Sequence, residues 1–258
     1  MSATWYCCRQ RAGPLVKECR ALRPRFGPED TATDHKEKLL LRRKQNGTFE
    51  RRQVDRLELI LAALGYRGSM HTLTFDDAHL PQRFDGVRLA LQNFFRRSQR
   101  WRAGLGKEPR FDYAYAIEGL HGQRRYHVHL CTGDDQLSPA EVAFLWKCGM
   151  VDNEPVLMKQ GGFRRLAEYL NKEKTDGVAI PIGRHPWSCS RSLLAKLPPP
   201  EKWKDDSGVI AVPRDVVYVR RGSVENDFGA YYYASWIEAP SRATDMNRAC
   251  AHTFNLEI

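Results

Sequence analysis

The sequence lacks any run of apolar residues that approaches the length of a membrane-spanning helix. Its first residues also lack the apolar stretch of a secretion signal, so we expect a cytoplasmic protein with no membrane partner. The seven cysteines include no Cys-x-x-Cys pair, and their odd number argues against a closed set of disulfides. Free thiols in a reducing compartment are the expected state.

The sequence also contains no internal repeat and no G-x-x-x-x-G-K-[ST] phosphate-binding loop. Its 258 residues are enough for one large domain, or for a compact domain with extensions. What the sequence does contain is positive charge, because its formal net charge is +10 and its arginines and lysines cluster in runs. This charge favours a polyanionic partner such as nucleic acid, although a solvated basic surface explains it as well.

Two histidines alternate along residues 125–131, a segment that is predicted to form a β-strand. Side chains two residues apart lie on the same face of a strand, so His127 and His129 present their imidazoles together. Val128 and Leu130 then face the opposite, buried side. Two adjacent imidazoles are half of a site for a divalent metal, whereas a solvated polar face would show the same alternation.

A carboxylate is predicted to join the two histidines from the preceding strand, residues 111–119. A two-residue turn at residues 121–122 would pair Glu118 with Arg125, and a register shifted by two residues would pair it with His127. Both registers place Glu118 on the histidine face. Two imidazoles and one carboxylate with open coordination positions suit Mg²⁺ or Mn²⁺. An ion pair between Glu118 and Arg125 is the alternative, and it does not exclude the metal.

The hydrophobic pattern predicts the order β-α-β-β-α-β-α between residues 68 and 176. The strands are expected at 70–75, 111–119, 125–131 and 155–158, and the helices at 85–102, 138–148 and 163–174. Four strands in one antiparallel sheet with helices on one face give an α+β fold of the ferredoxin or RRM-like type, with the histidines on the open face. Residues 1–67 are expected to be a basic extension with a helix over 50–64, and residues 177–258 a C-terminal extension with strands and possible DNA contacts.

The last predicted helix carries a second chemically distinctive pair, Tyr169 and Lys172. Residues three apart project from the same side of a helix, so the amine lies near the phenol. A tyrosine beside a cation and a divalent metal can act as a nucleophile on phosphorus. A half-buried tyrosine in an amphipathic helix is the alternative.

The helix predicted over 85–102 carries a cluster of basic side chains around an aromatic residue at its C-terminal end. Such clusters hold phosphates and stack bases. A solvated helix end explains this cluster equally well. The residues expected to contact DNA are Arg96, Arg97, Arg100, Trp101, Arg125, Arg165, Lys174 and Arg191. The run from Tyr231 to Tyr233 fits either a stacking patch or ordinary packing.

Three short motifs in this order resemble those of the HUH superfamily, in particular the single-tyrosine rolling-circle replication initiators of phages and plasmids. They are His71-Thr72-Leu73-Thr74-Phe75, Tyr126-His127-Val128-His129-Leu130 and Tyr169-Leu170-Asn171-Lys172. The resemblance covers about residues 69 to 175. The third metal ligand of the family has no matching histidine here, so Glu118 is inferred from its place on the sheet.

The resemblance implies an endonuclease and ligase of single-stranded DNA, with His127, His129 and Glu118 as metal ligands. Tyr169 would be the nucleophile and Lys172 its positioning or activating partner. Cleavage would leave a 5′-phosphotyrosine and a free 3′-OH, and rejoining would need no ATP. The implied partners are single-stranded or cruciform origin DNA, a separate helicase and a host polymerase, in the cytoplasm of a bacterial host cell.

Two alternatives to this function remain open. A relaxase or a tyrosine transposase of the same superfamily would use the same catalytic residues. A non-catalytic, RRM-like protein that binds nucleic acid would use the same sheet without a reaction. The carboxylate of Glu118 favours an enzyme, because it repels phosphate unless a metal lies between them.

Overall fold

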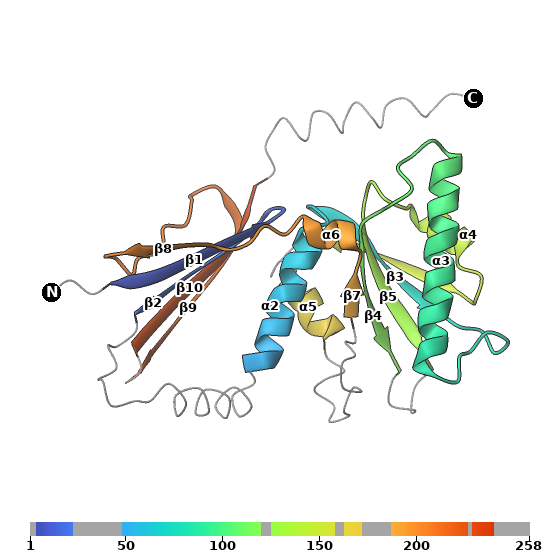
Figure 1. Ribbon diagram of the computed structural model, residues 1–258, viewed down its shortest axis with the longest axis horizontal. Helices are drawn as coiled ribbons and strands as arrows, with labels where there is room; N and C mark the ends of the chain where they lie inside the picture. The colour runs from blue at the N-terminus through green and yellow to red at the C-terminus, as the bar shows by residue number, and fades with distance from the viewer. Residues whose placement is uncertain are drawn as a thin grey trace. The chain divides into compact units, whose positions relative to one another are not determined.

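The structure of the protein is a computed structural model, and the residues that it describes form an α+β fold with two antiparallel sheets of five strands each (Figure 1). It describes residues 4–22, 48–119, 125–157, 163–171, 187–226 and 229–239. The chain divides into two compact units, one made of residues 26–197 and the other of residues 1–25 together with 198–258. Among the described helices, none is both long enough and apolar enough to cross a bilayer.

The larger unit is organised around one sheet with the strand order β6-β3-β5-β4-β7, in which every neighbouring pair is antiparallel. Its strands are β3 (Arg67–Thr74), β4 (Tyr113–Glu118), β5 (His127–Gly133), β6 (Val151–Leu157) and β7 (Trp187–Cys189). Its helices are α2 (Thr48–Ala62), α3 (Phe84–Gly104), α4 (Pro139–Leu145), α5 (Arg164–Leu170) and α6 (Arg191–Ala195). Helix α3 connects β3 to β4 and α4 connects β5 to β6, so each of these crossovers skips one strand of the sheet.

The two faces of this sheet are covered by different helices. Val128 and Leu130 point into an apolar core that includes Phe94 of α3 and residues of α4. His127 and His129 point to the opposite face, and residues of α5 line a groove with them. Figure 1 shows α3 on one side of the strands and α2 with α5 on the other.

The expectation that the helices pack on one face is therefore wrong, because α5 lies on the histidine face, and α2 of the same unit packs beside it. The helix itself was predicted correctly, and its residues Leu57, Ile60 and Leu61 are almost completely buried. Helix α5 lies beside α2, and the guanidinium of Arg164 bonds to the carboxylate of Asp55 at 2.6 Å. The apolar face of α2 thus helps to cover the histidine side of the sheet.

Helices α3 and α4 form where the sequence predicts them. Ser138 and Glu141 make the expected capping box, because each side chain accepts the backbone N–H of the other, at 3.3 and 2.8 Å. The strand expected over 155–158 begins earlier and spans Val151–Leu157. It is an edge strand with mostly exposed polar residues, and an edge is where a strand tolerates Pro155. The hydrophobic pattern therefore does not show where this strand begins.

Strands β4 and β5 pair with Glu118 directly opposite His127. The register that places Glu118 opposite Arg125 is therefore wrong, and the alternative shifted by two residues is confirmed. Gly119 has a φ of +90°, and a Cβ at this position would lie 2.7 Å from the carbonyl oxygen of Arg125. Glycine permits this close approach of the two backbones at the end of the strands. The predicted turn at residues 121–122 lies outside the described residues.

The smaller unit contains the second sheet, with the strand order β8-β1-β2-β10-β9. Its strands are β1 (Trp5–Ala12), β2 (Leu15–Leu22), β8 (Glu201–Asp205), β9 (Val216–Asn226) and β10 (Gly229–Glu238). Strand β2 pairs with β10, so segments from the two ends of the sequence share one sheet. The expected division into residues 1–67, 68–176 and 177–258 differs from this arrangement, because local patterns do not show which distant strands pair.

Candidate active site

Two histidines and one glutamate converge on the face of the larger unit's sheet that is opposite α3. Nε2 of His127 lies 3.1 Å from Oε2 of Glu118, and Nε2 of His129 lies 3.1 Å from Oε1 of the same carboxylate. Each side chain offers one ligand atom, and these atoms lie within 4.8 Å of one another. Neighbouring strands β4 and β5 supply all three residues, so the register of one strand pair sets the geometry of the site.

The other ring nitrogens of the two histidines contact the surrounding protein. Nδ1 of His127 lies 3.1 Å from the backbone carbonyl of Arg125, which can only accept a hydrogen bond. In the neutral imidazole of His127, Nε2 therefore carries the lone pair. Nδ1 of His129 lies 3.2 Å from the hydroxyl of Thr72, its direct partner on β3. Such contacts fix the ring orientation of metal-binding histidines, here with Nε2 directed at Glu118.

The burial of Glu118 tests whether a cation fits this site. The residue is 3% exposed, and an ionised carboxylate is unfavourable away from water unless positive charge accompanies it. A protonated imidazole would supply positive charge to one oxygen of the carboxylate. A divalent cation would be bound by all three side chains at once. Two imidazole nitrogens and one carboxylate are an established donor set for divalent metals. The residues present therefore fit a metal held by Glu118, His127 and His129.

Tyr169 extends from α5 to the same site. Its hydroxyl lies 3.3 Å from Nε2 of His129, and the two rings meet edge to face with centroids 5.2 Å apart. The residue is 40% exposed, so an incoming ligand can reach the hydroxyl. The structure thus brings the predicted nucleophile together with the predicted metal ligands.

Arg164 anchors the short helix that carries Tyr169. Its Nη1 lies 2.6 Å from Asp55 and 3.7 Å from Glu58, both on α2, and its Nε donates to Glu168 one turn along α5 at 2.6 Å. Although burial opposes the charge, hydrogen bonding to Glu168 and the nearby carboxylates raise the pKa of Arg164. The guanidinium therefore stays charged and ties α5 to α2, which positions Tyr169 over the sheet.

An open groove of about 670 Å³ runs over the site. This volume lies within the range of ligand-binding sites. His127, His129 and Tyr169 line the groove together with residues of β3, β6 and α5. Arg165, which was predicted to contact DNA, lines it too and contributes positive charge, whereas Glu154 contributes negative charge.

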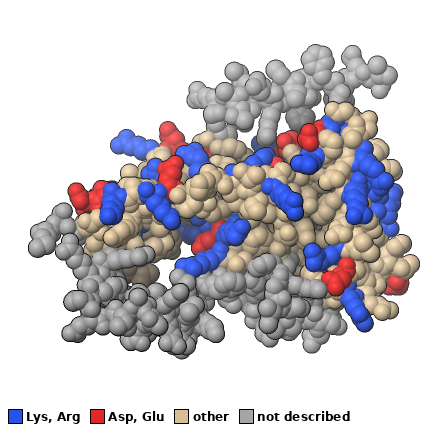
Figure 2. All heavy atoms as spheres, in the orientation of Figure 1, with Lys and Arg blue, Asp and Glu red and all other residues tan. Residues whose placement is uncertain are grey.

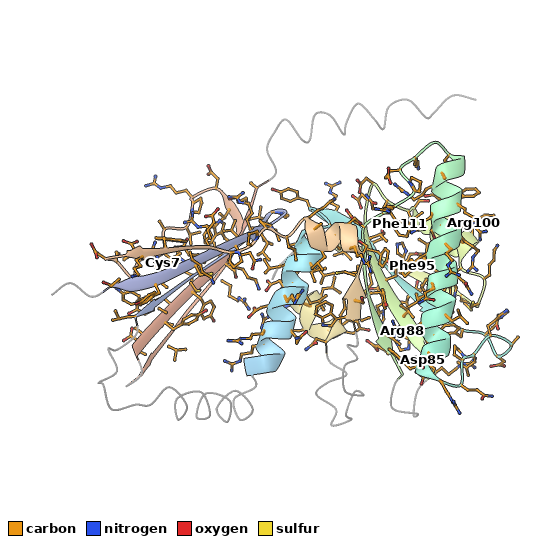
Figure 3. The ribbon with its side chains drawn as sticks, viewed as in Figure 1. Cys7, Asp85, Arg88, Phe95, Arg100 and Phe111 are labelled. Carbon is orange, nitrogen blue, oxygen red and sulfur yellow. The ribbon has the colours of Figure 1, made fainter. Side chains whose placement is uncertain are left out.

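The predicted DNA contacts on α3 lie on the other side of the sheet from the histidines. Figure 2 shows Lys and Arg side chains gathered over α3, and Figure 3 labels Arg100 on its outward side and Phe95 on the side of the strands. Arg96, Arg97 and Arg100 line a separate open groove of about 590 Å³. The structure therefore does not bring this basic cluster together with the candidate metal site.

Two members of the α3 cluster also make contacts within the fold. Arg97 donates from Nε to the backbone carbonyl of Leu145 at 2.9 Å. Trp101 donates from its indole nitrogen to Glu141 at 3.0 Å. Both side chains thus hold α3 against α4, whatever else they bind.

The remaining predicted DNA contacts are dispersed. The guanidinium of Arg125 lies 2.7 Å from a carboxylate oxygen of Asp77 and donates to a backbone carbonyl just after β3 at 3.1 Å. Arg191 is exposed at the start of α6 and is not among the residues that line the groove. Lys172 and Lys174 lie outside the described residues.

Sequence patterns did not reveal two residues that organise the site, Thr72 and Arg164. Alternation along β3 places Thr72 on one face, but only the pairing of β3 with β5 shows that this is the face of His129. Arg164 bonds to Asp55, which is 109 residues earlier in the chain, so no local spacing predicts the contact.

Comparisons of the chain with protein-family models, curated proteins and solved structures find no match. The arrangement of Glu118, His127, His129 and Tyr169 is therefore the strongest indication of what the protein does.

Proposed function

We propose that the protein is a metal-dependent endonuclease that cuts and rejoins single-stranded DNA through a 5′-phosphotyrosine at Tyr169. The observation that carries this function is the 3.3 Å separation between the Tyr169 hydroxyl and Nε2 of His129. A phenol this close to a residue that would hold the cation is placed to attack a phosphate bound in the groove. Mg²⁺ or Mn²⁺ is the expected cation, and single-stranded or cruciform origin DNA is the expected substrate.

The topology of the catalytic sheet supports the same assignment. The four strands from β3 to β6 follow the chain order β-α-β-β-α-β, and their spatial order is fourth, first, third, second. This order supports the proposal of a ferredoxin-like split βαβ unit. We therefore infer an HUH-type unit of this topology, with β7 as an added edge strand and α2 as an added cover.

The reaction exchanges one phosphoester for another. The chemistry that a bound divalent cation supplies is polarisation of a phosphate oxygen and stabilisation of the charge that develops on it. The phenolic oxygen of Tyr169 loses its proton and forms a bond to phosphorus, while the bond from phosphorus to the 3′ oxygen breaks. That oxygen takes up a proton and leaves as a free 3′-OH, and the 5′ end stays on Tyr169.

Reversal of this step rejoins the strand without ATP, because the 3′-OH can attack the phosphotyrosine. Tyr169 is the one tyrosine among the described residues that line the groove, so one site holds one 5′ end at a time. We expect a separate helicase to unwind the duplex, since the sequence has no phosphate-binding loop. A host polymerase would extend the 3′-OH, and the cycle would initiate rolling-circle replication.

A covalent adduct tests the proposed function. The full chain is incubated with Mn²⁺ and a pool of single-stranded oligonucleotides of randomised sequence, and adducts are separated on a denaturing gel and mapped by peptide mass spectrometry. We expect a nucleotide on the Tyr169 peptide, no adduct from Tyr169→Phe, and a normal adduct from the control Tyr126→Phe. An active Tyr169→Phe protein, or an adduct on the peptide with Tyr231 to Tyr233, would refute the assignment.

A non-catalytic RRM-like protein is less well supported. RRM sheets bind RNA through exposed aromatic side chains. Among the described strand residues on the histidine face, the one Phe, Tyr or Trp residue is Trp187, which is only 8% exposed. The carboxylate of Glu118 also disfavours phosphate at this face unless a cation is bound. A relaxase or a tyrosine transposase would use the same four residues, and the adduct experiment applies to each of them.

A further inference from the structure

The sheet of the smaller unit separates its charged side chains by face. Directly paired residues on neighbouring strands share a face, so the register assigns each strand residue to one side. One side, here called the mixed face, carries all the Asp and Glu residues of the five described strands: Glu18, Glu201, Asp205, Glu225 and Glu238. The other side, here called the basic face, carries Lys17, Lys202, Lys204 and Arg220, with no acidic residue among the strand positions that the structure describes.

The mixed face is used for folding. Arg20 pairs with Glu18 at 3.0 Å and with Asp205 at 2.5 Å, so its charge is neutralised within the sheet. Ile210 and Val212, from the segment between β8 and β9, pack against a small apolar core that includes Trp236. These ion pairs and this apolar core lie on the mixed face, whereas Ala12, Leu15 and Ile237 are the buried apolar residues at one end of the basic face.

The basic face combines its cations with exposed tyrosines. Tyr6 is 47% exposed and Tyr231 is 42% exposed. Nζ of Lys204 lies 5.7 Å from the ring centroid of Tyr6, and the guanidinium of Arg220 lies 5.9 Å from the ring of Tyr233. The rings of Tyr231 and Tyr233 are 6.2 Å apart along β10. Lys204 and Arg220 thus each lie beside a tyrosine ring on the same sheet face.

We propose that the basic face binds single-stranded nucleic acid, with Tyr6 and Tyr231 stacking on bases and Lys202 and Lys204 contacting phosphates. Lys202 and Lys204 are both exposed on this face, and exposed cations attract a polyanion. Unpaired bases stack on aromatic side chains, and such stacking tolerates any base because every base has a flat face. Binding at this surface needs neither a metal nor cleavage, so it goes beyond the nicking reaction and does not depend on it.

Fluorescence anisotropy of the full chain with labelled oligothymidylate of about 20 nucleotides, in excess chelator, tests the stacking. Replacing both tyrosines, Tyr6→Ala with Tyr231→Ala, is expected to weaken binding by at least about fivefold for each ring removed. The control pair Tyr6→Phe with Tyr231→Phe keeps both rings and is expected to bind like the unmodified protein. The bases of a duplex of the same length are already stacked. Its affinity is therefore expected to be the same for the Tyr→Ala double variant and the Tyr→Phe double variant.

The salt dependence of the same binding tests the phosphate contacts. Each cation that releases a counterion contributes about 0.7 to the slope of log K against log salt for a single strand. The pair Lys202→Ala with Lys204→Ala should therefore lower that slope by about 1.4. The matched control Arg221→Ala removes an exposed cation from the mixed face and should leave the slope unchanged.

These experiments are separable from the test of cleavage. His127→Ala and Tyr169→Phe should abolish cleavage while oligothymidylate binding in chelator stays the same, so failure of the nuclease would leave this inference standing. Unchanged affinity in the Tyr→Ala pair together with an unchanged slope in the Lys→Ala pair would overturn it. If the same substitutions instead dissociate a dimer in analytical ultracentrifugation without affecting oligothymidylate binding, the face is an interface between copies and the inference is wrong.

Discussion

Glu118 and His127 lie directly opposite each other on β4 and β5, with the carboxylate oxygen Oε2 3.1 Å from the imidazole Nε2. Because direct cross-strand partners share a face, this pairing fixes the position of the third ligand in the candidate metal site. A slip of one residue would move Glu118 to the side of α3 and away from both histidines. The geometry of the site is therefore a property of the strand register.

Replacing Glu118 should weaken metal binding. Glu118→Gln keeps the size of the side chain but removes its charge, so we expect Mn²⁺ affinity to fall by at least about tenfold and nicking to stop. Calorimetric titration with Mn²⁺ measures the affinity without requiring DNA. Glu154→Gln, which changes a carboxylate that lines the same groove, should bind Mn²⁺ normally. Normal Mn²⁺ binding by Glu118→Gln would mean that the third ligand lies elsewhere.

Removing the hydroxyl of Thr72 should loosen the His129 ring. Thr72→Val keeps the shape of the side chain but removes the contact at 3.2 Å from Nδ1, and residues that orient metal ligands are typically worth about 10- to 100-fold in metal affinity. Thr72→Ser keeps a hydroxyl and should stay close to the unmodified protein. Equal Mn²⁺ affinities in the Val and Ser variants would show that Thr72 does not orient the ring.

Loss of Arg164 should affect both stability and cleavage. Arg164→Met removes the cation that faces Glu58, a residue only 1% exposed, so we expect the free energy of unfolding to fall by about 1–3 kcal/mol. Nicking should fall while Mn²⁺ binding is retained, because the metal ligands lie on the sheet and Tyr169 lies on α5. Urea unfolding and calorimetric titration measure the two effects, and the exposed neighbour Arg165→Met is the stability control. If Mn²⁺ affinity fell as much as nicking, the expectation that Arg164 affects Tyr169 without affecting the metal ligands would be wrong.

The pH dependence of stability should report on His71. This residue is fully buried, with Nδ1 2.6 Å from Asn153 and Nε2 3.1 Å from Thr132, and burial lowers the pKa of His71 below its ordinary value of 6.5. As the pH falls below 6.5, the unfolded chain binds a proton that the folded chain resists. The free energy of unfolding should therefore decline between pH 6.5 and the lower pKa of the folded state.

His71→Gln isolates this contribution, because other titrating groups act equally in both proteins. Urea unfolding at about pH 7.5 and about pH 5.5 should show a smaller decline in the variant than in the unmodified protein. The same decline in both proteins would assign the acid sensitivity to other groups.

The local patterns of the sequence predicted the faces of the strands in the candidate site better than the surroundings of these strands. The alternation of His127 and His129 with Val128 and Leu130 is a period-two signal, and it correctly assigned the two faces of β5. The position of Glu118 required the strand register, which depends on the backbone approach at Gly119 and was left as two alternatives.

The second sheet was not predicted as a unit because its strands come from distant parts of the chain. Strands β1 and β2 alternate aromatic, cysteine and charged residues without a continuous apolar face, and their partners β8 and β10 are near the other end of the sequence. Arg20 and Glu18 look like solvated charges in the sequence, but their side chains are almost completely buried as an ion pair. The contact of Arg20 with Asp205, which is 185 residues later in the chain, forms only because β8 pairs with β1.

The pairing of β2 with β10 also sets an order of events during synthesis. The larger unit is continuous in sequence, so it is complete on the ribosome before the chain reaches β8. At a typical synthesis rate of about 5–20 residues per second, about 10–40 s pass between the synthesis of β2 and that of the strands that complete its sheet. During that interval both edges of the hairpin offer unpaired backbone groups, so a nascent chain is exposed to pairing with its neighbours on the same messenger RNA.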